Sequence, residues 1–231
     1  MQLQFIVSPI VKYWGNSIMK TVKIKKSFTL IEMIAVVAIA GALIAMFVPA
    51  FSRMMFGSKV DQAASDFKLG LEMAQAQAVS SRKYVAMVIP QYYGKADKRL
   101  QPYCDGGYRL AFVDKEGHFF GWVPGSSWRN AADGARFLQL VTNLKDLKLD
   151  SSVSEDEDWT SLGDDQNRKA VIFSPYGGVV GDRNLEFSFT EAAYSGENTD
   201  DERAKYDFPN EDNKVTLILN FVTGRVKYKE D

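Results

Sequence analysis

The chain has 231 residues, which is enough for one membrane anchor and one folded domain of modest size. Apolar residues make up 46% of it and charged residues 25%, a composition that is typical of globular domains and excludes a largely disordered chain. The net charge of -1 excludes an overall basic field that would attract nucleic acid. The single cysteine, Cys104, excludes an intrachain disulfide, and the single histidine, His118, excludes any site that needs two imidazoles.

Near the N-terminus, residues 33–48 form a run of sixteen residues without a charge or a strongly hydrogen-bonding side chain. Extended to Phe28 and Phe51, the run reaches the ~20 residues needed to span hydrocarbon. Only Arg53 and Lys59 follow it closely, whereas four lysines precede it. The positive-inside bias therefore predicts a cytoplasmic N-terminus and an exported chain after about residue 51. The preceding lysines are Lys20, Lys23, Lys25 and Lys26.

Glu32 lies near the start of this apolar stretch. A single carboxylate deep in a bilayer costs roughly 2.5–3.5 kcal/mol on insertion scales, so such a residue indicates a function. No Lys or Arg lies within the helical turns that follow it. The nearest cation would be a new α-amino group, if the chain were cut just before Phe28.

Residues 25–51 read KKSFTLIEMIAVVAIAGALIAMFVPAF. This segment resembles the N-terminal motif of type IV pilins and type II secretion pseudopilins of bacteria. The resemblance implies that a prepilin peptidase of the inner membrane cuts between Ser27 and Phe28 and methylates the new N-terminus at Phe28. It also implies that Glu32 pairs with the terminal amine of a neighbouring pilin or pseudopilin subunit, and that Pro49 loosens the helix. The family usually has Gly where this chain has Ser27.

The motif predicts the division of the chain, and Met19 begins a shorter, more typical leader at which translation is expected to start. Two plainer interpretations are an uncleaved signal anchor and a secretory signal peptide cut near residues 48–50. Neither of them explains Glu32. The expected parts are a leader in residues 1–27, a transmembrane assembly helix in 28–51, an amphipathic continuation of that helix in 52–81, and an exported β-rich domain in 82–231.

The continuation of the helix carries an apolar stripe, since apolar residues recur there at spacings of four and three. From Lys83 onward the period changes to two and turn residues recur, which predicts strands. Residues 114–117 and 223–224 are expected to form hairpin turns. We therefore predict an α+β fold, with the long helix packed on a mostly antiparallel sheet. The stripe is Val60, Ala64, Phe67, Leu71, Ala74 and Ala78, and the expected strands are 84–89, 108–113, 118–123, 144–149, 170–173, 185–189, 215–222 and 225–228.

Two local sequences are similar to those of GspH/FimT-type minor pseudopilins. Residues 173–177 read FSPYG and resemble the F-x-P-x-G element of that group. Residues 215–227 resemble its terminal hairpin, with the T-G-R-V core in residues 223–226. Both sequences also fit simple turn chemistry, because Pro favours a bend and Gly accepts a positive φ.

Acidic residues gather in residues 151–165 and 197–212. Calcium needs six to eight oxygens at one point, on the order of what an EF-hand loop supplies. Neither stretch has that spaced pattern, so we expect solvated surface loops and no metal site.

Three classes of function remain, and the first is a filament subunit of a type II secretion pseudopilus or a type IV pilus. The second is a DNA-binding minor pilin that uses Arg225, Lys227 and Lys229, which alternate and so share one strand face. The third is an enzyme, which we do not expect because the chain lacks the common catalytic motifs. No cofactor and no small-molecule substrate are expected.

Overall fold

A computed structural model describes the backbone of residues 30–130, 134–139, 141–150, 153, 157–163, 167–197 and 204–229, and it leaves out the side chains of residues 48–57, 157–158 and 197. Contacts divide the chain between Phe47 and Val48 into two units, and each is considered by itself. The expected leader and Phe28 lie outside the described residues.

Helix α1 (Leu30–Ser81) contributes to both units. It ends where Arg82 adopts a φ of 54°, and the Lys83 N–H then bonds the Ala78 carbonyl at 3.3 Å, which satisfies one terminal carbonyl of the helix. In the second unit the predicted apolar stripe is confirmed, because each member is at most 1% exposed. The buried stripe consists of Val60, Ala63, Ala64, Phe67, Leu71, Ala74 and Ala78.

The larger sheet of the second unit is antiparallel except at one edge, where β3 and β6 run parallel. Strands β1 and β2 keep a regular register, from Tyr84 opposite Val113 to Val88 opposite Arg109. The hydrogen-bonded order is β5 (Lys145–Asp146), β7 (Lys169–Phe173), β1 (Tyr84–Val88), β2 (Arg109–Val113), β3 (His118–Trp122) and β6 (Lys148–Leu149).

The two edge strands of this sheet, β5 and β6, belong to one segment and are joined by Leu147. On one side the segment pairs with β7, and the Leu147 N–H bonds the Arg168 carbonyl at 2.7 Å. On the other side it pairs with β3, and the Lys148 N–H bonds the Gly117 carbonyl at 2.9 Å. The segment therefore closes the sheet on itself in the manner of a small barrel.

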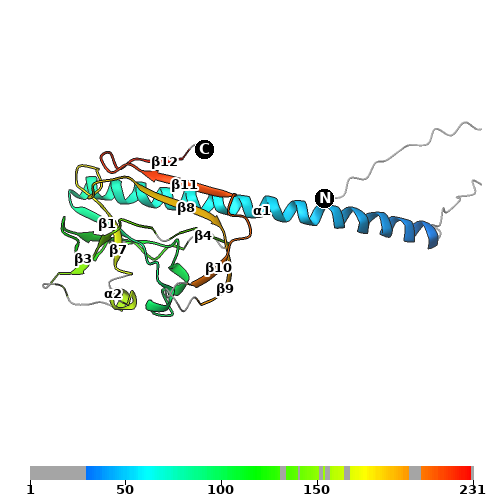
Figure 1. The fold of residues 1–231 in the computed structure, drawn as a ribbon, viewed down its shortest axis with the longest axis horizontal. Coiled ribbons are helices and arrows are strands. Elements are labelled where there is room, and N and C mark those ends of the chain that lie inside the picture. The colour runs from blue at the N-terminus through cyan, green and yellow to red at the C-terminus, as the bar shows by residue number, and fades with distance from the viewer. Residues whose placement is uncertain are drawn as a thin grey trace, which may run out of the picture. The chain divides into compact units, whose positions relative to one another are not determined.

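The smaller sheet of the second unit is antiparallel, and β11 and β8 run alongside the second half of α1 (Figure 1). A separate two-stranded ribbon joins β9 (Ala193–Glu197) to β10 (Ala204–Asp207). The predicted α+β class, a helix on mostly antiparallel sheet, is thus confirmed. The order of the smaller sheet is β12 (Val226–Tyr228), β11 (Lys214–Leu219), β8 (Leu185–Glu191) and β4 (Ala135–Phe137).

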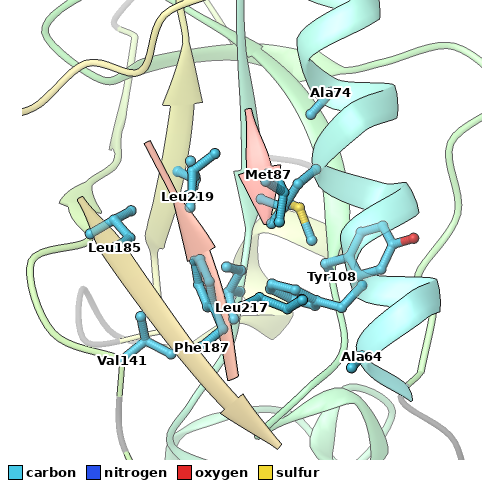
Figure 2. Packing of buried hydrophobic residues seen from close by; sticks show 14 of the residues in the cluster. Ala64, Ala74, Met87, Tyr108, Val141, Leu185, Phe187, Leu217 and Leu219 are labelled. Atoms are coloured by element: carbon cyan, nitrogen blue, oxygen red, sulfur yellow. The ribbon is translucent and has the colours of Figure 1, made fainter. Parts of the chain in front are cut away.

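The main core lies between α1 and both sheets, with Phe67 of the helix at its centre. The centroid of the Phe67 ring is 4.9 Å from that of Phe187 and 5.3 Å from that of Phe189. Figure 2 shows Phe187 beside Leu217 of β11 and Tyr108 against the helix. Tyr108 can approach α1 because residue 70 is Gly, whose missing Cβ would otherwise collide with the tyrosine ring.

A second core fills the opposite face of the larger sheet, where alternate residues of β1 and β7 point. Trp159 is fully buried in it and lies over Phe119, with ring centroids 4.5 Å apart. Trp159 belongs to helix α2 (Glu157–Ser161), inside the first acidic stretch. The expectation of a solvated loop is therefore wrong for Trp159 and Leu162, because both contribute to a core.

Several elements differ from the predicted ones. Strands β4, β9 and β10, and the 3-10 helices η1 (Tyr93–Lys95) and η2 (Gln101–Tyr103), were not expected. Strand β11 ends at Leu219, and residues 220–225 form a loop in which the Gly224 N–H bonds the Asn220 carbonyl at 2.8 Å. The 114–117 turn is confirmed, since the Asp114 N–H bonds the His118 carbonyl at 3.1 Å.

Replacing Phe67 with Ala should destabilise the second unit by about 3–5 kcal/mol, because it empties the centre of the main core. Urea unfolding of the detergent-solubilised protein, followed by tryptophan fluorescence, measures this change. Leu69→Ala is the matched control on the same helix, since Leu69 is half exposed and should cost about 0.5 kcal/mol or less. Equal losses in both variants would contradict the packing described.

Candidate functional site

The first unit contains a helical segment, Leu30–Phe47, that is long and apolar enough to cross a membrane by length and composition. Within the described residues it is the one segment with this property. All of its side chains are exposed, whereas a core helix of similar composition would be buried. One N-terminal apolar helix of this kind fits a single-pass membrane anchor.

Glu32 lies in the first turn of α1, and its side chain is exposed. A carboxylate there interacts favourably with the N-terminal end of the helix dipole, which contributes about 0.3–1 kcal/mol. That gain is smaller than the roughly 2.5–3.5 kcal/mol that insertion of a charge into a bilayer costs. Local helix electrostatics therefore does not account for a glutamate at this position of a membrane segment.

The other residues of the expected N-terminal site are described only in part. Pro49 lies inside α1, where the backbone is helical, but its side chain lies outside the described residues. Ser27 and Phe28 also lie outside them. The expected cleavage and methylation position therefore remains a prediction from the sequence.

The two C-terminal motifs, residues 173–177 and 215–227, both contact α1 through the side chain of Gln75. The Gln75 side-chain amide donates one hydrogen bond to the Gly177 carbonyl at 2.6 Å and another to the Thr223 carbonyl at 2.8 Å. Between the two motifs, the Val179 N–H bonds the Phe221 carbonyl at 2.8 Å. Gln75 thus joins the F-x-P-x-G turn and the loop of the terminal hairpin to the helix, a junction that the sequence did not predict.

Glycine is required at the closest point of this junction. Gly224 has a φ of 65°, and a Cβ at this position would collide with the Gly177 carbonyl oxygen and the Gln75 amide. Gly177 also has a positive φ, of 88°. Gly224 therefore serves both the turn conformation and the close approach of the loops, whereas Gly177 serves the turn conformation. At the tip of the first turn, Tyr176 is 95% exposed.

The three cations of the C-terminal strand lie together, as their alternation predicts. Arg225, Lys227 and Lys229 line a surface groove of about 590 Å³ at β11 and β12. Tyr228, between two of them, bonds the Ser65 hydroxyl of α1 at 3.1 Å and lies under the Lys68 ammonium. The strand is thereby attached to the helix.

An acidic residue reduces the charge of this groove. The Lys229 ammonium lies 3.2 Å from a carboxylate oxygen of Glu186 on β8. Both side chains are about half exposed, so the pair adds little stability, but it does cancel one charge. Arg225 and Lys227 have no ion-pair partner among the described residues.

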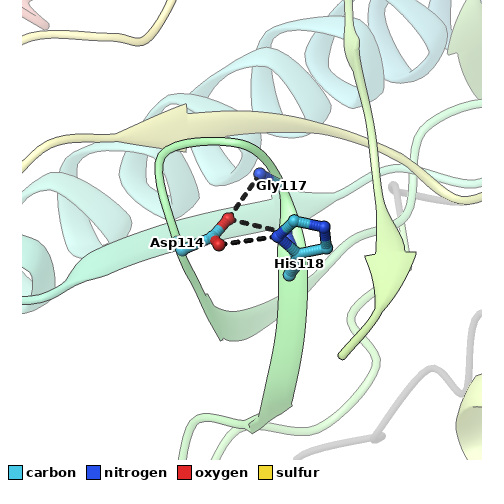
Figure 3. Close-up of polar contacts among 3 residues, drawn as sticks. All are labelled: Asp114, Gly117 and His118. Carbon is cyan, nitrogen blue, oxygen red and sulfur yellow. Dashed lines mark hydrogen bonds and ion pairs between the residues drawn. The ribbon is translucent and has the colours of Figure 1, made fainter. Parts of the chain in front are cut away.

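His118 lies at the base of the β2–β3 hairpin and bonds Asp114 (Figure 3). Its Nδ1 is 2.7 Å from one carboxylate oxygen, and the other oxygen accepts the N–H groups of Gly117 and His118, each at 2.8 Å. Partial burial raises the pKa of Asp114, but these hydrogen bonds outweigh it and hold the pKa below its usual value. The contact stabilises the expected turn at residues 114–117.

Cys104 is fully buried, and its thiol points to the Leu100 carbonyl at 3.8 Å. Burial raises the pKa of the Cys104 thiol far above its ordinary value, and the neighbouring Asp105 adds to the effect. Such a thiol is a poor nucleophile and metal ligand. Within the described residues, His, Cys, Asp and Glu side chains form no group of three that could hold a metal ion.

No family model matches the sequence, and no curated protein matches it. The structure is similar to the type IV minor pilin FimU of Pseudomonas aeruginosa PAO1, at 14% identity and a TM-score of 0.37 over 75% of this chain and 90% of that one. It is also similar to the minor pseudopilin EpsH of the Type 2 Secretion System of Vibrio cholerae, at 11% identity and a TM-score of 0.37 over 75% and 99% of the two chains. Similarity at this level carries no functional argument.

Replacing Gln75 with Ala should lower the free energy of unfolding by about 1–2 kcal/mol, because it removes two hydrogen bonds that join three segments. Gln77→Ala is a matched control in the same helix, and we expect a change within about 0.5 kcal/mol for it. Urea unfolding of the detergent-solubilised variants gives both values. If the two substitutions had the same effect, the Gln75 junction would not stabilise the fold.

Proposed function

We propose that this chain is a pilin-like filament subunit, a minor pseudopilin or minor pilin, anchored in a bacterial inner membrane by α1. The observation that carries the proposal is the combination of an exposed apolar helix with a glutamate in its first turn. A plain anchor needs the apolar side chains but not the charge. An assembly helix needs both, because the charge selects one arrangement of neighbours.

The apolar side chains of Leu30–Phe47 would form the packing contacts of the proposed helix bundle. In the membrane they contact lipid, and in a filament they would contact the same helices of neighbouring subunits. Exchange of one apolar surrounding for another changes the free energy little, so these contacts alone would not fix a register. Glu32 supplies the missing specificity, since a buried charge is penalised in every register that does not place a cation against it.

The proposed cation is the α-amino group of Phe28 in a neighbouring subunit, after a prepilin peptidase has cut behind Ser27. Because it is the new N-terminus of the same helix, it would lie about one helical turn from Glu32 along the axis. A small axial offset between neighbours would then bring amine and carboxylate together. The exported β-rich domain would remain on the far side of the membrane, as the lysine bias of the leader predicts.

A DNA-binding minor pilin is the second proposal, and the basic groove at β12 is its one supporting feature. Lys229 is paired with Glu186, so two cations, Arg225 and Lys227, remain for phosphates. Each phosphate contact contributes roughly 0.9 to the slope of log affinity against log salt, so two contacts give weak, salt-sensitive binding. We therefore favour the filament subunit.

Mass spectrometry of the mature protein should give an N-terminus at Phe28 that carries one added methyl group. This result is expected because the peptidase of the family cuts and methylates at the residue after the basic leader. The control is the same protein isolated from cells that lack the peptidase. An N-terminus near Phe51 would instead indicate an ordinary secretory signal peptide.

Glu32→Ala should leave the protein in the membrane and reduce its incorporation into filaments by about tenfold or more, because the register loses its charge penalty. Asp61→Ala is the matched control, since it removes an exposed carboxylate from the part of α1 that follows the proposed assembly segment. Membrane fractionation and immunoblots of sheared filaments measure both steps. Normal incorporation of Glu32→Ala would contradict the proposed role of the carboxylate.

A further inference from the structure

A groove of about 570 Å³ lies where α1 passes into β1 and beside the β2–β3 hairpin. Its floor is aromatic, and Phe120 in it is 46% exposed. The register of β2 against β3 shifts between Phe112 and Val113, which leaves the strands irregular at this point. A Cβ on Gly121 would meet open space among the described residues, so none of these residues covers this part of the floor. The aromatic residues that line the groove are Tyr84, Phe112, Phe120 and Trp122.

Two cations stand at the edge of this cation–aromatic groove, Arg82 and Lys83, and both are exposed. The Lys83 ammonium lies 5.3 Å from the centroid of the Phe112 ring, and neither cation has an ion-pair partner among the described residues. The groove also contains one acid, Asp114, but its carboxylate is held by His118 and by the backbone of the turn (Figure 3). The groove therefore presents positive charge above an apolar floor.

Residues 207–212, DFPNED, form a turn of the opposite chemistry, here named the acidic turn. Asp207, Glu211 and Asp212 are exposed, and none of them has an ion-pair partner in the part of the chain that the structure describes. Pro209 is exposed at its tip. The Thr190 hydroxyl of β8 bonds the carbonyls of Asn210 and Asn213, each at 3.1 Å, so the turn is held in place before any partner arrives.

The groove and the acidic turn lie at opposite ends of the second unit. Thr190 is two residues from Ala192, whose N–H bonds the Gly134 carbonyl at 2.9 Å, and Gly134 in turn lies beside Lys59 of α1. The groove instead begins at Arg82, just after the helix ends. Between Lys59 and the end of the helix lie ~33 Å of α-helix. In Figure 1, β10 and β3 mark these two ends.

We propose that the acidic turn of one copy docks into the cation–aromatic groove of a second copy. The charges are complementary, and the exposed proline suits an aromatic floor. Because the two surfaces lie at opposite ends of one domain, the contact is head-to-tail and leaves a free groove and a free turn on every pair. Contacts of this kind build closed rings or open helical filaments, depending on whether the rotation between copies closes. This inference rests on the proposed function, because it requires that two copies of the chain lie next to each other in a filament.

Cross-linking of full-length chains in intact cells tests the contact. Two differently tagged chains are co-expressed, one with Lys83→Cys and the other with Asp212→Cys, and treated with a short bis-maleimide. Cys104 is fully buried, so the engineered cysteines are the ones that react. We expect a covalent dimer that carries both tags. Asp182→Cys in place of Asp212→Cys is the control, because Asp182 is an exposed acid outside the acidic turn.

The dimer with both tags should exceed the control by about fivefold or more, as expected for a contact steered by charge. A second experiment exchanges the charges across the contact. It uses the cross-linking pair Arg82→Cys and Glu211→Cys, which leaves Lys83 and Asp212 free to be changed. Adding Lys83→Glu to the first chain should lower the yield, and adding Asp212→Lys to the second should restore it. A yield no higher than the control, a loss that is not restored, or cross-links solely to a different protein would overturn the contact.

Failure of this contact is distinguishable from failure of the proposed function. If the protein enters filaments in a manner that depends on Glu32, but the dimer with both tags does not form, the head-to-tail contact alone is wrong. If Glu32→Ala enters filaments normally, the assembly role of the helix is wrong whatever the cross-links show.

Discussion

The fold of the second unit depends on burial of one stripe of α1. Seven small or apolar residues of the helix face both sheets, and Phe67 contacts rings from β4 and β8 at once. Alanine at four of the seven positions lets the strands approach the helix closely, and Gly70 does the same for Tyr108. Segments that pack on this stripe position the Gln75 junction, strand β12 and both grooves.

Much of this arrangement follows from local sequence. The stripe shows a helical period, and the turn at Asp114–Gly117 combines an acid that accepts backbone N–H groups with a glycine. The three-residue strand β4 and the ribbon β9–β10 escaped prediction because such short segments show no clear period. The burial of Trp159 was not predicted, because acidic residues dominate the local composition. Its burial depends instead on Phe119 and the closed sheet.

The candidate site was predictable to a similar degree. Alternation placed Arg225, Lys227 and Lys229 on one face, but the carboxylate that neutralises Lys229 comes from Glu186, 43 residues earlier, and only the fold brings the two together. Gln75 lies 102 and 148 residues from its two partners, so a polar residue on a helix gave no sign of its role. Such pairings between distant segments depend on topology, which the periodicity of a single segment does not encode.

The bond between Ser65 and Tyr228 joins residues 163 positions apart, and it has a consequence for the order of folding. The stripe of α1 leaves the ribosome before any strand of the sheet unit, while β11 and β12, which cover it, leave after the other described strands. Contacts of such long range form late, because the intervening chain must be ordered first. Until then the growing chain displays an uncovered apolar helix face. A factor that binds apolar helices, or the membrane surface itself, would therefore have a long interval in which to protect this face from aggregation.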